Sequence, residues 1–308
     1  MPGPSRSTRR PAVAGRFYPA DEAQCTSAAR QFVRANEQTA LNPNWRGAIV
    51  PHAGWMFSGA IAGEAIGTLK AARESAGRPE PQVVVVFGAV HTPIPLLRAA
   101  MDANQRWSVP GGASSVFVEL SEKLEADASE MFGVDARFHQ REHAVEVEVP
   151  LIQRAWPNAM LMPIEVPLID EAPAIGRRVA RLIDVMNVDA VYLASSDLTH
   201  YGPDFRFVPA GVGAAALAWA KDNDRRLLDV VAAMAVESVV PEVRDRASAC
   251  GGGAIAAMLA ACKQHGLASG ASGDVRILRH ESSDDVMLRI APHERSDNAV
   301  GYAAVVLG

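Results

Sequence analysis

Several residues that could bind a metal ion or move a proton stand just after short apolar runs of the sequence. The runs 47–51, 82–88 and 189–194 each lead into a turn or polar cluster that contains a histidine. In an open α/β sheet, the carboxyl ends of parallel strands meet at one edge, so side chains that follow different strands can converge there. With similar residues farther along the chain, the candidates are His52, His91, His143, Glu146, Asp197, His200 and Cys250.

Two histidines and one cysteine from this set would make a good site for a transition metal. Imidazole nitrogens and a thiolate suit Zn²⁺, Fe²⁺ or copper, and three protein ligands leave coordination positions open for a substrate. Cys250 precedes three glycines and the apolar run 254–262, which places it at or just before the start of a predicted helix. The helix dipole favours a thiolate there. Cys262 lies inside the run and is predicted to be a core residue.

The remaining candidates are of the types that act as acids and bases beside a metal. A histidine that titrates near neutral pH can move a proton, and a carboxylate beside it fixes its tautomer. These residues are His200, His143, Asp197 and Glu146. Alternatively, Asp197 caps a helix and His143 lies on the surface. No spacing forms a compact His-Glu-x-x-His motif, and no nucleotide-binding or serine-hydrolase motif is present, so the residues leave the reaction open.

The composition is that of an ordinary globular protein. The 308 residues are 49% hydrophobic and 21% charged, and the net charge is −5 without a basic block, which argues against nucleic acid or an anionic membrane as a partner. Three scattered cysteines do not make a disulfide framework and suit a reducing cytoplasm. No apolar stretch approaches the roughly 20 residues of a membrane span. Residues 1–8 lack the apolar core of a signal peptide and are expected to be flexible.

The pattern of apolar residues predicts one α/β domain over residues 1–308. The run 82–88 is β-branched and unbroken, which is typical of a strand covered on both faces of a parallel sheet. We therefore expect a mainly parallel central sheet flanked by helices. Further strands are predicted at 160–166, 275–278, 286–290 and 301–307, an irregular excursion at 99–112, and helices at 21–36, 53–75, 117–128, 172–186, 214–235 and 242–247, with a break at 239–241.

The segment 140–152 is ambiguous because its alternating valines and glutamates imitate an edge strand. A helix is favoured, with His143 and Glu146 on one face and Pro150 ending or kinking its first part.

Four segments resemble the Memo family, whose bacterial and archaeal members are called AmmeMemoRadiSam system protein B. They are Arg-x-Pro-Ala-Val-Ala-Gly-x-Phe-Tyr-Pro at 9–19, Pro-His-Ala-Gly-x-x-x-Ser-Gly at 51–59, Glu-His-x-x-Glu at 142–146 and Ser-Ser-Asp-x-x-His-Tyr-Gly at 195–202. The resemblance runs in order from near Arg9 to beyond Cys250. It implies a fold like that of the LigB-type class III extradiol dioxygenases, and a functional link to a radical SAM protein.

The resemblance also implies His52, His91 and Cys250 as metal ligands, with His143, Asp197 and His200 around the same pocket. The expected activity is that of a non-haem iron-dependent, dioxygenase-like oxidoreductase acting on a phenolic or catechol-like molecule. Fe²⁺ is the expected ion, with copper or Zn²⁺ as alternatives. Cys250 replaces the carboxylate of the usual iron triad, so dioxygenase activity does not follow from the fold. A binding or scaffold module and a copper redox protein are the competing functions.

One segment departs from the family pattern. A Gly-Pro-Ser-His-His run is common after the second strand, whereas this chain has Gly-Ala-Val-His-Thr at 88–92. The expected ligand His91 is kept, but a neighbouring imidazole is absent, which alters the expected substrate contacts.

Overall fold

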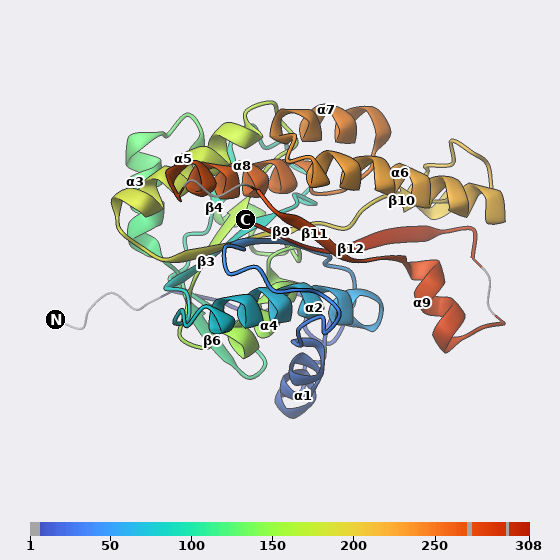
Figure 1. The fold of residues 1–308 in the computed structure, drawn as a ribbon, viewed down its shortest axis with the longest axis horizontal. Helices are drawn as coiled ribbons and strands as arrows, with labels where there is room; N and C mark the ends of the chain where they lie inside the picture. Colours follow the sequence, from blue (N-terminus) through green and yellow to red (C-terminus); the bar gives the residue numbers. More distant parts are fainter. Residues whose placement is uncertain (1–6, 270–272, 294–295) are drawn as a thin grey trace.

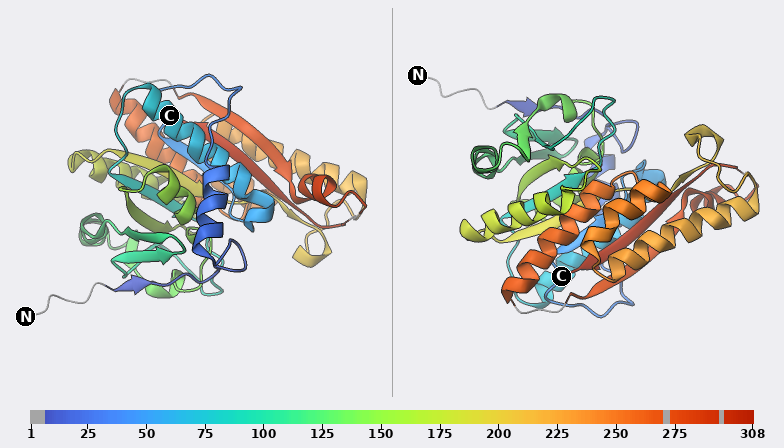
Figure 2. Two further views of the ribbon diagram at one scale, coloured as in Figure 1. Left: turned by 90° about the horizontal axis from the view of Figure 1, so that it is seen from below. Right: turned by 90° about the horizontal axis from the view of Figure 1, so that it is seen from above.

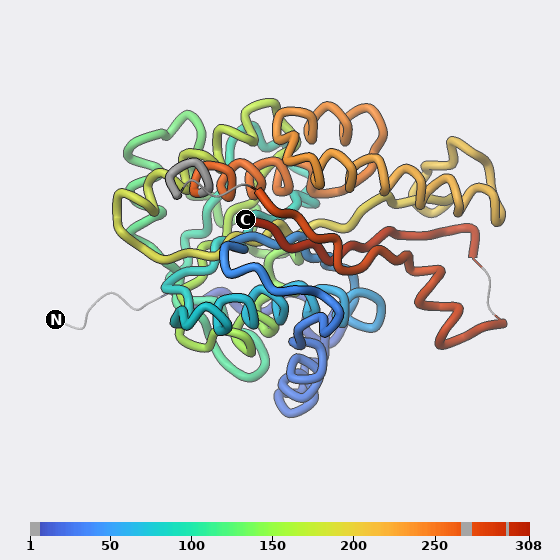
Figure 3. Tube along the Cα trace, in the orientation of Figure 1, coloured from blue at the N-terminus to red at the C-terminus, as the bar shows by residue number. Residues whose placement is uncertain are grey.

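The computed structural model describes residues 7–269, 273–293 and 296–308, with the side chains of 266–269 left out. The expected flexibility of residues 1–8 therefore falls almost wholly outside the described residues. Within them, one mixed β-sheet runs through the centre of the molecule and helices cover both of its faces (Figures 1 and 3). This arrangement confirms the predicted α/β class and is consistent with a class III extradiol dioxygenase-like fold.

Four parallel strands form the middle of the sheet, in the order β2, β9, β3 and β8. Their bounds are β2 Gly47–Val50, β9 Ala190–Ser195, β3 Val83–Gly88 and β8 Met160–Glu165. In β3, Val83, Val85 and Phe87 face one core while Val84 and Val86 face the other. Burial on both faces explains the unbroken apolar run, because neither side of the strand meets water.

The strands that border this centre run antiparallel to it, so the sheet is mixed and the predicted parallel arrangement describes its centre. On one side, β12 Ala299–Leu307 lies beside β2 and also pairs with β10 His200–Tyr201 and β11 Val275–Ser282. On the other side, β4 Ala99–Met101 lies beside β8 and pairs with β7 Phe132–Val134. A separate small sheet contains β1 Thr8–Arg9, β5 Arg106–Val109 and β6 Gly112–Ser115.

The helices form two layers, one on each face of the sheet in Figure 1, and Figure 2 shows the molecule from below and from above. One layer contains α1 Glu22–Phe32, α2 Trp55–Ser75 and α4 Val149–Ala155. The other contains α3 Val118–Asp127, α5 Ala172–Val185, α6 Ala214–Ala232, α7 Val236–Arg246 and α8 Gly252–Ser269. Helix α9, Ser283–Ile290, projects beyond the end of the sheet (Figure 1). No helix of the described residues is long and apolar enough to cross a bilayer.

The parallel strands end level with one another, and this register brings the candidate residues together. Ser195, the last residue of β9, pairs with Val50 of β2 and with Gly88 of β3, and Gly88 pairs with Glu165 of β8. The loops that leave these ends therefore start from one line along the edge of the sheet. They carry His52, Asp197 and His91.

Helix α8 delivers Cys250 to the same edge because its first turn packs closely on the segment after β8. A side chain at Gly253 would collide with the backbone of Pro167, so only glycine allows this approach. Just before the helix, the Gly251 N–H donates to Ser196 Oγ at 2.9 Å. Cys262 is buried in the core, as predicted, with its Sγ 3.7 Å from Met258 Sδ.

The structure corrects the expectation for 140–152. Residues 142–145 make a turn, a 3₁₀ helix η2 covers Glu146–Glu148, and α4 begins at Val149. The Glu142 carboxylate accepts the N–H groups of His143 and Ala144, which fixes this turn before the helix. Pro150 lies in the first turn of α4, where no intrahelical N–H bond is lost, so it starts a helix instead of ending one.

Two further expectations were wrong. The predicted strand 286–290 is part of helix α9, because Ser282 and Asp285 form a capping box that favours a helix at this point. The predicted break at 239–241 lies inside α7, where Pro241 is accommodated in the second turn. Two other short 3₁₀ helices are η1 Ala136–Phe138 and η3 Pro203–Phe205.

Candidate metal centre

Three imidazole rings meet at the edge of the sheet. The ring centroid of His52 lies 5.1 Å from that of His91 and 5.1 Å from that of His143, and the latter two are 4.5 Å apart. His52 follows β2, His91 follows β3, and His143 precedes η2. The structure therefore brings together three of the four candidate histidines from well-separated parts of the sequence, and His143 is not a surface residue.

His52 is buried and presents its Nε2 atom to Cys250. Its Nδ1 atom lies 3.0 Å from Ser195 Oγ, and the Ser195 hydroxyl donates to the Ala144 carbonyl at 2.6 Å. Because that hydroxyl has only one proton, which it donates to Ala144, its oxygen accepts a hydrogen bond from His52 Nδ1–H, and this leaves the lone pair of the ring on Nε2. Burial, with the neighbouring imidazoles, keeps the pKa of His52 well below its ordinary value. The neutral Nε2 atom lies 3.3 Å from Cys250 Sγ.

His91 is oriented by Glu142. Glu142 Oε1 lies 2.9 Å from His91 Nδ1, and Oε2 accepts the His91 N–H at 2.6 Å. The same carboxylate lies 3.2 Å from His143 Nδ1. Burial would raise the pKa of Glu142, but its bonds to His143 and His91 hold it well below the usual range. Burial would lower the pKa of His91, but hydrogen bonds to Cys250 and Glu142 raise it to about 10.

Cys250 faces both ligand histidines from the start of α8. Its N–H donates to the Asp197 carbonyl at 3.2 Å, which ties it to the loop after β9. Burial raises the pKa of the thiol, although His91 opposes that shift. The expected effect of the helix dipole is thus outweighed by burial in the metal-free protein. A metal ion would release the thiol proton, since the thiolate is the ligand form.

Asp197 and His200 border the cluster. Asp197 is buried, and its Oδ1 accepts the N–H groups of His52 and Ala53 at 2.8 and 3.3 Å, so it fixes the turn after β2. Burial raises the pKa of Asp197 and lowers that of His200, and each charge opposes the shift of the other. The His200 ring packs edge-on against Phe205 at a centroid distance of 5.0 Å.

Glu146 lies away from the cluster, which corrects its expected role as an acid or base there. Its carboxylate is fully buried and accepts bonds from Arg9 Nη1 at 2.7 Å and from the Tyr18 hydroxyl at 2.8 Å. The N–H groups of Ala12 and Val13 also donate to it. All these donors belong to the N-terminal segment, so Glu146 anchors that segment against the domain. Phe17 in the same segment packs on His143 at 4.7 Å.

Sequence reasoning missed the residues that hold the ligands in place. Glu142 is next to His143, and Ser195 is the last residue of β9. Both lie in segments that resemble the family, but their residue types alone do not show that they orient a ligand histidine. Glu148 and Glu165 are also buried near this edge, and burial keeps the pKa of each far above its usual value. Burial therefore favours the protonated form of both carboxyl groups.

The geometry fits a transition metal at His52, His91 and Cys250, whose ligand atoms all lie within 4.8 Å of one another. The 3.3 Å between His52 Nε2 and Cys250 Sγ is near the roughly 3.5 Å expected between two ligands of a tetrahedral ion at usual bond lengths. His91, Glu142 and His143 form a second, overlapping group. Glu142 already accepts several N–H groups, so its geometry suits orientation of the histidines better than ligation.

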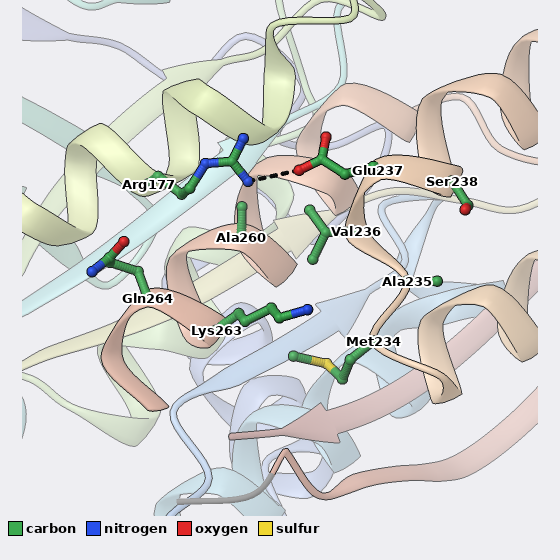
Figure 4. A pocket seen from close by; sticks show the side chains of 9 residues that line it. All are labelled: Arg177, Met234, Ala235, Val236, Glu237, Ser238, Ala260, Lys263 and Gln264. Atoms are coloured by element: carbon green, nitrogen blue, oxygen red, sulfur yellow. Dashed lines mark hydrogen bonds and ion pairs between the residues drawn. The ribbon is translucent and has the colours of Figure 1, made fainter. Parts of the chain in front are cut away.

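A hollow between α5, α7 and α8 lies far from this centre (Figure 4). Its lining includes Lys263, which lies about 16 Å along α8 from Gly252 at the usual rise per residue. Arg177 and Glu237 form an ion pair across it at 2.8 Å. It contains none of the candidate residues.

The sequence matches the family described as "Memo-like protein" over residues 9–306. A MEMO1 family protein of Methanosarcina mazei is 30% identical over 308 residues, covering 97% of this chain and 98% of that protein. One from Nitrosopumilus maritimus is 28% identical, covering 96% and 98%. An uncharacterized protein of Escherichia coli K12 shares the fold with a TM-score of 0.50 and 11% identity, over 86% of this chain and 100% of that one. This chain therefore belongs to the Memo family.

Proposed function

We propose that this chain binds Fe²⁺ through His52, His91 and Cys250 and uses it as an oxygen-dependent oxidoreductase on a phenolic or catechol-like small molecule. The observation that carries the proposal is the convergence of two imidazoles and a thiol at one edge of the sheet, with His52 Nε2 facing Cys250 Sγ at 3.3 Å. A protein core does not gather such groups for stability, because burying polar groups without full pairing is unfavourable.

The proposed ligands are prepared for a metal by their neighbours. Ser195 leaves the lone pair of His52 on Nε2, and Glu142 binds Nδ1 of His91, so that its other nitrogen is turned to the cluster. Carboxylate or hydroxyl partners of this kind orient ligand histidines and increase their basicity. Bound Fe²⁺ would supply an electron source and open coordination positions for dioxygen and a phenolate.

His200 is the proposed base for a phenolic hydroxyl. Burial lowers its pKa, so the ring is neutral at pH 7 and can accept a proton. Asp197 favours the resulting imidazolium, because its charge opposes the shift that burial causes. His143 packs against the rings of His52 and His91 and is the second candidate base, with Phe17 and Glu142 in contact with it.

The first experiment is metal analysis of protein purified without oxygen. The wild type is expected to contain close to one equivalent of iron, and His52→Ala and Cys250→Ser to contain little. His293→Ala, which changes an exposed histidine outside the cluster, is the matched control. The proposal fails if the wild type holds less than about a tenth of an equivalent of any transition metal, since a catalytic site must be substantially occupied.

The second experiment tests the reaction itself. Oxygen uptake with 4-methylcatechol is expected from the iron-loaded wild type, and it should fall at least about a hundredfold in His200→Ala while iron content is retained. If the fully loaded wild type takes up no oxygen, the proposed reaction is refuted and a binding module is the remaining function. Retained uptake in His200→Ala would remove that residue from the mechanism.

Copper is the second candidate ion, and Cys250 favours it because a thiolate is a soft ligand. Protein loaded with copper would then cycle between two oxidation states without consuming a phenol. Electron paramagnetic resonance of the native metal distinguishes copper from iron directly.

A further inference from the structure

A second hollow lies beside the metal centre, at the end of the molecule where α9 meets the sheet. Its volume is about 360 Å³, which is within the range of small-molecule pockets. The residues that matter for its chemistry are Phe57, Phe205, Asp284, Met287, Val300 and Tyr302. They come from α2, η3, α9 and β12, so four elements that are distant in sequence close around one space.

The β10–β12 ladder connects this hollow to the metal centre. His200 pairs with Val300, and antiparallel partners present their side chains on the same face of a sheet. Tyr302 is two residues farther along β12 and shares that face. The loop after β9 is also bonded to β12: the Leu198 N–H donates to the Gly301 carbonyl at 2.8 Å.

His200 lies between the candidate metal centre and a residue that lines the hollow. Its ring packs on Phe205, which lines the hollow and is itself 41% exposed. Its charge also interacts with those of Asp197, His91 and His143 in the cluster. The contact between His200 and Phe205 therefore links the candidate metal centre to the wall of the hollow.

The walls of the hollow are mainly aromatic and apolar, with the polar residues Ser283, Ser296 and Asn298 and a single charged residue. Asp284 is the only charged residue among the described residues that line it. Its half-buried carboxylate makes no hydrogen bond or ion pair with any described side chain, while the neighbouring Asp285 is paired with Lys221 and Ser282. Aromatic rings attract cations through their faces, and a carboxylate at the same place strengthens that preference.

We infer that this hollow binds a protonated aromatic amine, with its ring between Phe57, Phe205 and Met287 and its ammonium group at Asp284. It is the subsite for the non-reacting end of the substrate, a role that rests on the proposed function. The occupant is thus a small aromatic cation.

The test uses three probes of similar size that share a phenyl ring, differ in the charge of their terminal group and carry no phenolic hydroxyl. They are 2-phenylethylamine, 2-phenylethanol and phenylacetate, titrated into the full-length, metal-loaded protein by calorimetry. The amine is expected to bind about five- to tenfold more tightly than the alcohol, and the acid more weakly than either. Methyl NMR of labelled methionine should show the Met287 signal moving with the amine.

Two variants with matched controls locate the binding. Asp284→Asn should remove the advantage of the amine over the alcohol, whereas Asp245→Asn, an exposed aspartate on α7, should keep it. The helix cap on Ser282 and Asp285 is untouched, so α9 should stay folded. Met287→Trp should fill the hollow and weaken both probes at least about tenfold, while Leu288→Trp on the outer side of α9 should not.

Equal affinity for the cation and the anion, or equal losses in Met287→Trp and Leu288→Trp, would overturn the inference. These probes do not test oxygen chemistry, so the subsite and the proposed function can fail separately. Charge-selective binding in a protein without catechol oxidation would refute the function and leave the binding site in place.

Discussion

The imidazoles of His52 and His91 are held by different partners, and these partners decide which nitrogen faces Cys250. His52 donates a hydrogen bond from Nδ1–H to the neutral hydroxyl of Ser195, and burial lowers the pKa of His52 and favours its neutral form. His91 is bound by the Glu142 carboxylate, which favours the protonated ring. In the metal-free protein the two ligands therefore differ in charge, and binding of a metal must remove protons from this centre.

Glu142→Gln tests the orienting carboxylate. The amide loses the charge that holds His91 and His143, so metal affinity is expected to fall about ten- to a hundredfold without loss of the fold. Competition with a chromogenic chelator measures the change, and Glu237→Gln, on an exposed ion pair, is the control. An unchanged affinity would show that Glu142 is structural only.

The pH dependence of metal binding follows from the raised pKa values. A proton on His91, with a pKa of about 10, and one on Cys250, whose pKa burial also raises, compete with the metal below those values. Affinity should therefore increase with pH, by about tenfold per unit for each proton displaced. Cys250→Ser should reduce the slope between about pH 6 and pH 8, and a flat profile in the wild type would contradict this assignment.

At the scale of elements, the short segment from Glu142 to Glu148 places three glutamates against three different parts of the molecule. Glu142 faces the metal centre, Glu146 faces the N-terminal segment, and Glu148 Oε1 lies 3.3 Å from Ser195 Oγ. A turn followed by a 3₁₀ helix points these side chains in different directions. A regular α-helix would have placed Glu142 and Glu146, which are four residues apart, on one face.

Glu146→Ala should destabilise the protein through the N-terminal segment. It leaves the buried Arg9 guanidinium without its partner, and breaking a buried ion pair costs about 3–5 kcal/mol. Denaturant unfolding followed by tryptophan fluorescence measures the loss. Glu237→Ala, which breaks an exposed pair, should cost less than about 1 kcal/mol. The iron content of the folded variant should equal that of the wild type. A selective loss of iron would show that Glu146 acts at the metal site and would contradict this assignment.

Gly176→Ala tests the contact between α5 and α8. A methyl group there would meet the Ala257 carbonyl of α8, and forced overpacking typically costs about 1–3 kcal/mol or more. The expected result is a lower unfolding midpoint, measured by circular dichroism. The control is Ala174→Ser on the same α5 helix. A glycine with a positive φ, such as Gly77, would be a poor control because any side chain there adds backbone strain. An unchanged midpoint would mean that the helices can separate freely.

At the scale of the whole molecule, the metal centre joins parts of the chain that are far apart. Its residues come from loops after β2, β3 and β9, from the turn before η2, and from the start of α8. Binding of an ion to all of them favours the folded state by mass action, because the unfolded chain cannot hold them together.

Metal loading is therefore expected to stabilise the entire domain. At about 100 times the dissociation constant the gain is about 2.7 kcal/mol, which for a chain of this length corresponds to a rise in Tm of about 4 °C. Calorimetry with and without a chelator measures the shift. Cys250→Ser should abolish it, and an equal shift in that variant would indicate that the ion binds elsewhere.

The sequence by itself determined the strands that end at His52, His91 and Asp197 and the helix that follows Cys250, because apolar runs and their stops are local signals. These signals were enough to predict the α/β class and the edge where the candidate residues meet. The tertiary structure decided the rest: that Glu142 and not Glu146 faces the cluster, that Ser195 sets the tautomer of His52, and that burial opposes ionisation of Cys250. Each of these depends on which distant groups surround a side chain, and no local pattern of residues encodes that.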